Sequence, residues 1–74
     1  MAELEKIRAL LDYYRQHNNE HAEKYMELAT TTRLAGNEEL SSIFVKLYLE
    51  SRRLNRLFEA AKKHAVSEGV RKRQ

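Results

Sequence analysis

Two histidines with a glutamate beside them are the residues of this chain best suited to chemistry. The string HNNEH, residues 17–21, places His17 and His21 four positions apart, with Glu20 directly before the second. Residues i and i+4 share one face of a helix, so the two imidazoles can chelate zinc, nickel or cobalt. This pattern predicts a metal site of His17, His21 and Glu20 for a divalent transition metal.

The same string matches the H-x-x-E-H pattern of one class of zinc protease. A catalytic zinc needs three protein ligands and an open position for water, but the remaining histidine, His64, lies far along the chain. A chain of 74 residues leaves no room for a substrate cleft, and it has no glycine-framed nucleophile or phosphate loop. We therefore expect no enzyme, no catalytic residues and no cofactor, with the metal as the alternative.

The elements that position these residues follow from apolar residues recurring in alternating steps of three and four, the period of a helix. One such row, here called a seam, runs through Leu4, Ile7, Leu11, Tyr14, Asn18, His21, Tyr25, Leu28, Thr32 and Ala35. A second seam runs through Leu40, Phe44, Leu47, Ser51, Leu54, Phe58, Ala61 and Ala65. The fold class predicted is all-α, a two-helix antiparallel hairpin.

The glycines and an asparagine set the predicted boundaries. Gly36 can close one helix in the left-handed conformation and Asn37 can cap the next, which gives helices over 2–35 and 38–68 around a turn at 36–37. Gly69 ends the hairpin, 1–69, and leaves 70–74 as a basic disordered tail. A break at Asn18-Asn19 would instead give a three-helix protein, but the seam keeps its phase through these residues, which favours one continuous helix.

Apolar residues outside the seams predict a second layer of helices. The string IFVKLYL, residues 43–49, is apolar almost all the way round, and a helix of this kind is covered on more than one face. A second copy of the hairpin would complete a four-helix bundle. The predicted homodimer interface comprises Ile43, Leu47, Tyr48, Leu57 and Phe58; another protein as partner stays open.

A few polar residues interrupt the seams. In an antiparallel hairpin that turns at 36–37, residue i lies near residue 73−i, which brings Asn18, His21 and Ser51 to about one level. Polar residues within a helical seam fix register, because only the correct alignment lets them hydrogen-bond. We predict a structural polar layer of Asn18, His21 and Ser51, with a small ligand or a pH-responsive contact as alternatives.

The formal charge of +3 is concentrated in the second half of the chain. A solvated helix face is the first interpretation, and phosphate binding is the other. No recognised DNA-binding motif is present, so nucleic-acid binding ranks as the third function hypothesis. Its residues would be Arg52, Arg53, Arg56, Arg71, Lys72 and Arg73.

Targeting signals are missing from the sequence. There is no cysteine, no apolar run near the roughly 18 residues of a membrane span, and an acidic amphipathic start unlike a signal peptide. We expect a soluble cytoplasmic protein without membrane contact.

Residues 20–58 resemble the helical hairpin that forms half of rubrerythrin-type, ferritin-like bundles. Tyr25, Ala29, Gly36, Leu40 and Phe44 match that hairpin's tyrosine, small residue, turn glycine and following apolar positions. The resemblance implies a dimeric four-helix bundle. It implies no di-iron site, since the ligand positions of such proteins, a glutamate and an E-x-x-H pair, hold Asn18, Ser51 and Leu54 here. The string HNNEHAEKY is also similar to small prokaryotic helical-hairpin domains of unknown function.

Overall fold

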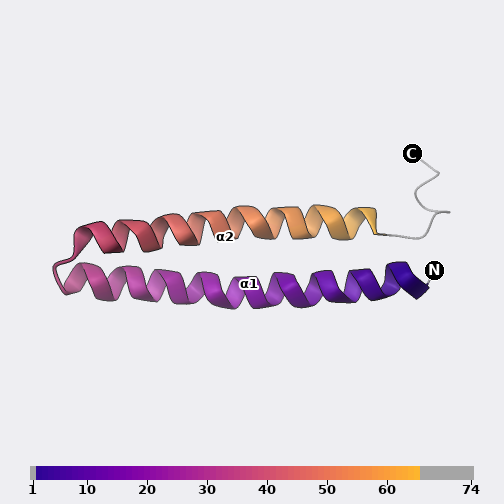
Figure 1. Ribbon diagram of the computed structural model, residues 1–74, viewed down its shortest axis with the longest axis horizontal. Helices are drawn as coiled ribbons and strands as arrows, with labels where there is room; N and C mark the ends of the chain where they lie inside the picture. Colours follow the sequence, from indigo (N-terminus) through magenta and orange to yellow (C-terminus); the bar gives the residue numbers. More distant parts are fainter. Residues whose placement is uncertain (1, 66–74) are drawn as a thin grey trace.

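The chain forms a hairpin of two long helices, which the computed structural model describes over residues 2–65 (Figure 1). Helix α1 spans Ala2–Leu34 and helix α2 spans Glu38–His64. The helices lie side by side and antiparallel, so the start of α1 and the end of α2 are at the same end of the molecule (Figure 1). The predicted all-α, two-helix hairpin is confirmed.

The helix bounds differ from the prediction mainly at the end of α2. Helix α1 is continuous through Asn18 and Asn19, so the three-helix alternative is wrong. Helix α2 ends at His64, earlier than the predicted end at 68, because Ala65 leaves the helical conformation with φ −93° and ψ 55°. The predicted tail, 70–74, and Gly69 lie outside the described residues.

The turn between the helices is built by the two residues predicted for it. Gly36 adopts φ 88°, and the N–H groups of Gly36 and Asn37 donate to the carbonyls of Arg33 and Thr32 at 3.0 and 2.9 Å. This is the Schellman pattern, which satisfies the last carbonyls of a helix. The Asn37 side chain then accepts from the Leu40 N–H at 3.0 Å and caps α2. The chain therefore reverses within a few residues.

Small side chains fill the contact between the two helices. Within residues 2–65, the buried residues are Ala22, Ala29, Ser41, Ser51 and Ala65, and no large side chain is fully buried. The Ser41 side-chain hydroxyl on α2 donates to the Ala29 backbone carbonyl on α1 at 2.6 Å. Small residues let the helices approach closely, but they remove little apolar surface from water.

The contact uses only half of each predicted seam. The positions spaced by seven, such as Leu11, Asn18, Phe44 and Phe58, are at least partly buried between the helices. The intervening seam residues Tyr14, His21, Leu28, Leu40, Leu47, Leu54 and Ala61 are exposed instead. The residues that take their place each lie one position later: Arg15, Ala22, Ala29, Ser41, Tyr48, Asn55 and Lys62. The seam prediction is wrong by about 100° for these positions. At Ala22, Ala29 and Ser41 the smaller of two neighbouring residues occupies the contact, which lets the helices approach closely.

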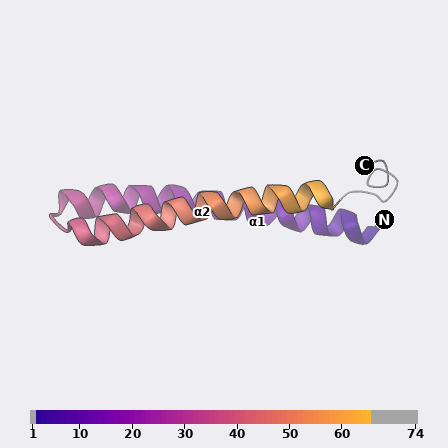
Figure 2. The same cartoon turned by 90° about the horizontal axis from the view of Figure 1, so that it is seen from above.

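The molecule is one helix thick. Its extents are 55, 21 and 10 Å, and the view from above shows α2 lying obliquely over α1 (Figure 2). The radius of gyration is 16.9 Å, whereas a compact domain of this length would have about 11 Å. Both broad faces of the hairpin are consequently open.

Candidate functional site

The two histidines of the HNNEH string converge on one point of α1. Their Nε2 atoms lie 3.1 Å apart and the ring centroids 4.6 Å apart, with both side chains exposed. The Glu20 carboxylate lies 4.0 Å from Nδ1 of His17. Tyr13 stacks on His17 at a centroid distance of 5.7 Å. The four-residue spacing on a helix thus produces the face-sharing pair that the sequence predicted.

The histidine pair borders a shallow hollow between the helices. The hollow measures about 280 Å³ and is lined by Tyr14, His17, Asn18, His21, Tyr25, Leu54 and Phe58. Tyr14 and Phe58 meet across it with ring centroids 6.2 Å apart. Because α1 and α2 both contribute aromatic or apolar side chains here, this broad side of the hairpin is apolar at its middle.

Exposed apolar residues continue along this side of both helices, beyond the hollow. On each helix, the residues spaced by seven from Tyr14 or Leu54 lie on the same side as that residue. The residues three positions after each of these lie on this side too. We call the exposed large apolar residues at these positions the apolar face: Ile7, Leu10, Tyr14, Leu28, Leu40, Ile43, Leu47, Leu54 and Leu57. The other positions of this side hold His17, His21, Lys24, Thr31, Glu50, Ala61 and His64, so polar residues interrupt the face. Three of the predicted dimer residues, Ile43, Leu47 and Leu57, belong to it, and they are 52%, 39% and 62% exposed.

The other two predicted dimer residues are placed differently. Phe58 is partly buried at the floor of the hollow, where it lines the apolar face from beneath. Tyr48 lines a groove of about 400 Å³ on the opposite side, together with Arg15, Asn19, Arg52 and Arg56. Tyr48 therefore does not contribute to the apolar face.

Asn18 is the centre of the polar contact between the helices. Its Nδ2 donates to the Ser51 carbonyl and to Oδ1 of Asn55, each at 2.8 Å. His21, predicted in this layer, is exposed and contacts His17 instead. Asn55 takes its place, and the antiparallel pairing of i with 73−i had already placed Asn55 opposite Asn18. Nδ2 of Asn55 also donates to Oδ1 of Asn19, at 3.5 Å.

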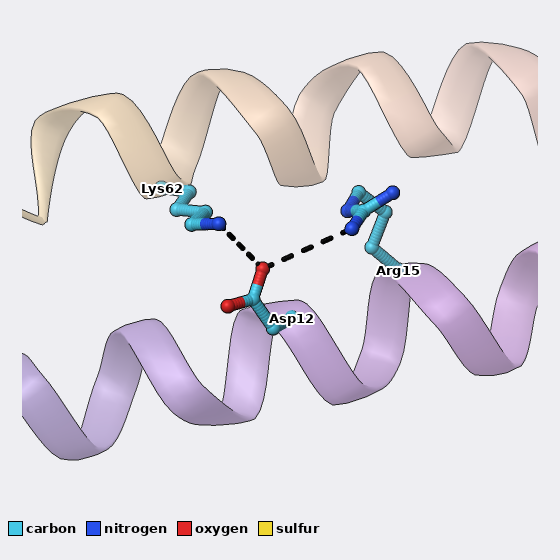
Figure 3. Close-up of polar contacts among 3 residues, drawn as sticks. All are labelled: Asp12, Arg15 and Lys62. Atoms are coloured by element: carbon cyan, nitrogen blue, oxygen red, sulfur yellow. Dashed lines mark ion pairs between the residues drawn. The ribbon is translucent and has the colours of Figure 1, made fainter.

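A second polar contact, which sequence reasoning missed, joins the helices nearer their open end. Asp12 pairs with Lys62 at 2.6 Å and lies 4.0 Å from Arg15 (Figure 3). The hydrogen bond from Lys62 is the main cause that lowers the pKa of Asp12, with desolvation opposing it and the charges of Lys62, Arg15 and Arg8 adding to it. The same pairing rule brings residues 12 and 62 together, so opposite charges at matched levels were the available signal.

The arginines proposed for nucleic-acid binding do not form an uninterrupted basic surface. The Arg52 guanidinium donates to the Tyr48 hydroxyl at 3.1 Å, and Arg53 lies 3.8 Å from the Glu50 carboxylate. Arg56 lines the opposite groove together with two acids, Glu23 and Glu59. The remaining residues of that prediction, Arg71, Lys72 and Arg73, lie outside the described residues.

The described residues lack two features, which restricts their chemistry. Among residues 2–65, no group of three or more His, Cys, Asp or Glu side chains is arranged to hold a metal ion. The histidine pair is therefore a two-ligand site at most within one chain. Neither described helix has the length and apolar character needed to cross a membrane.

Comparison with known proteins identifies a family but no described activity. No functionally curated protein and no solved structure matches the sequence. The resemblance to ferritin-like hairpins thus stays a prediction. One family profile matches residues 7–65, which includes both helices, the histidine pair and the apolar face. By that match the chain belongs to the family described as Domain of unknown function (DUF8180).

Proposed function

We propose that this hairpin is a small interaction module that homodimerises through its apolar face into a four-helix bundle, and that it is not an enzyme. The observation that carries the proposal is the contrast between the interior and the face. The buried interior between α1 and α2 holds alanine and serine, whereas the nine large residues of the apolar face are exposed. Large aliphatic residues contribute most to stability when they are covered.

The energetics of a lone hairpin support this proposal. A chain of this size is marginally stable even when it is compact, and small domains often need a metal, disulfides or oligomerisation. The sequence has no cysteine, and the described residues contain no fully buried large side chain. Covering the apolar face would supply the missing burial.

The area of the face suits a stable interface. The two longer extents of the hairpin, 55 and 21 Å, enclose a broad side of about 1,150 Å². A specific protein interface buries about 800 Å² on each partner. The face is therefore large enough for a complete interface rather than a transient contact.

A second copy is the occupant that best matches the shape of this face. The exposed residues follow both helices at heptad spacing, from Ile7 to Leu28 and from Leu40 to Leu54. Such rows pack against other long helices with the same period. Another hairpin of equal length offers two such rows, and a two-fold axis lets the same patch serve both partners.

Sedimentation velocity combined with thermal unfolding tests the dimer. We expect a dimer whose Tm rises with protein concentration, because association stabilises only the folded chain. The double variant Leu47→Lys, Leu54→Lys places two charges on the apolar face and should be monomeric or unfolded. Leu49→Lys is the matched control, since Leu49 is 56% exposed and lies about 200° around α2 from Leu47; it should remain a dimer.

A wild-type chain that stays monomeric at all concentrations, with a Tm that does not change, would overturn the proposal. So would a double variant that retains the dimer and its Tm. If Leu49→Lys dissociated the chain while the double variant did not, the interface would lie on the opposite side of the hairpin.

A further inference from the structure

The separation of the two imidazole nitrogens is close to that of a metal chelate. Nε2 of His17 and Nε2 of His21 lie 3.1 Å apart. Two histidine nitrogens that bind one tetrahedral zinc at 2.0–2.1 Å lie about 3.3 Å from each other. Both imidazoles could therefore bind one ion with only a small adjustment of their side-chain torsions.

The surroundings favour the same nitrogens as ligands. The Glu20 carboxylate lies 4.0 Å from Nδ1 of His17, on the side of the ring away from the partner histidine. This distance is longer than a hydrogen bond. A carboxylate that closes to hydrogen-bond distance would hold a proton on Nδ1 and leave the other nitrogen free for the metal. Tyr13, stacked on His17 at an interplanar angle of 11°, restricts the orientation of that ring.

We propose that His17 and His21 form a chelating site for a divalent transition metal such as Zn²⁺, Co²⁺ or Ni²⁺, with Glu20 as a positioning residue. The pair supplies two of the four positions of a tetrahedral ion, and water fills the others. The site lies at the middle of α1 and at the edge of the apolar face. It does not require dimerisation, so it is a claim separate from the proposed function.

The competing explanation is an ordinary hydrogen bond between two neutral imidazoles. In that arrangement one Nε2 carries a proton and the other accepts it. For a metal to bind both Nε2 lone pairs, this proton moves to Nδ1 of the same ring, so that both imidazoles stay neutral. The two explanations predict different results when metal is added. A chelating pair binds the ion, whereas a pair that is only hydrogen-bonded does not.

Titration of the full chain with Co²⁺, followed by visible absorbance, and with Zn²⁺, followed by calorimetry, tests the site. We expect saturation at one ion per chain. His21→Gln should weaken binding about 100-fold, because the second imidazole of a chelate binds at a millimolar or higher effective concentration. Glu20→Gln should weaken it on the order of tenfold, as loss of a carboxylate beside a ligating histidine does. His64→Gln, at the end of α2, is the control and should bind as the wild type does.

Thermal unfolding provides a second readout. Metal at about 100 times its Kd should raise the Tm of the wild type by on the order of 10 °C, since binding favours the folded helix. The same metal should leave the Tm of His17→Gln nearly unchanged.

Absence of saturable binding in the wild type would overturn the site, as would unchanged affinity in a chain carrying both His17→Gln and His21→Gln. Loss of binding in His64→Gln alone would assign the ion to another place. Sedimentation of each variant measures its oligomeric state independently of metal binding. Because both ligands lie within one chain, the metal site can be overturned while the dimer stands, and the reverse.

Discussion

Enlarging Ala22 should destabilise the hairpin, although the seam pattern in the sequence treats it as a residue outside the contact. Ala22 is 3% exposed and lies between the helices, one position after His21. A leucine at this position would have to fit between two helices whose close approach depends on small side chains. Overpacking of this kind costs about 1–3 kcal/mol of unfolding free energy.

The size of the effect can be measured cleanly because helix propensity contributes little. Alanine and leucine are both strong helix formers, so the substitution changes packing and not the intrinsic preference of α1. A loss of 1–3 kcal/mol corresponds to a fall in Tm of roughly 4–20 °C for a domain of this size. Ala9→Leu, on an exposed part of the same helix, is the matched control and should change the Tm little.

Urea unfolding followed by far-UV circular dichroism, at one fixed protein concentration, gives the comparison. The structural reasoning is refuted if Ala22→Leu is as stable as the wild type or more stable. That result would mean that His21, and not Ala22, faces the second helix, as the original seam pattern indicated.

Three other predictions concern contacts between the helices and the turn. Asn18→Ala should lose about 1–3 kcal/mol in urea unfolding, because it removes two hydrogen bonds of 2.8 Å to α2. Gly36→Ala should lower the unfolding free energy by about 1–2 kcal/mol, because the backbone at this position keeps φ 88°. An added Cβ would meet nothing within 4 Å, so the cost lies in the backbone conformation alone. The pKa of Asp12 is lowered from 3.8, so its ionised form contributes stability that is complete above that pH and is lost as the pH falls through the lower folded-state value. In an acid titration followed by circular dichroism, Lys62→Met should lack this part of the decline; an unchanged profile would contradict it.

The sequence by itself determined the helices and the turn. The apolar period fixed two helices, and local chemistry at Gly36 and Asn37 fixed where the chain reverses, because caps and turns depend on a few neighbouring residues. The pairing of i with 73−i follows from the turn alone and correctly brings Asn18 to Asn55. The face-sharing of His17 and His21 follows from helix geometry alone.

Only the tertiary structure decided which flank of each seam faces the other helix. Positions such as His21 and Ala22, or Leu47 and Tyr48, are neighbours about 100° apart, and either can continue a pattern of three and four. Periodicity cannot separate them, since the choice depends on how closely two backbones approach. Close approach selected Ala22, Ala29 and Ser41 for the interior and left their larger neighbours His21, Leu28 and Leu40 exposed. The same choice moved His21 out of the polar layer and beside His17, where it can act as a ligand.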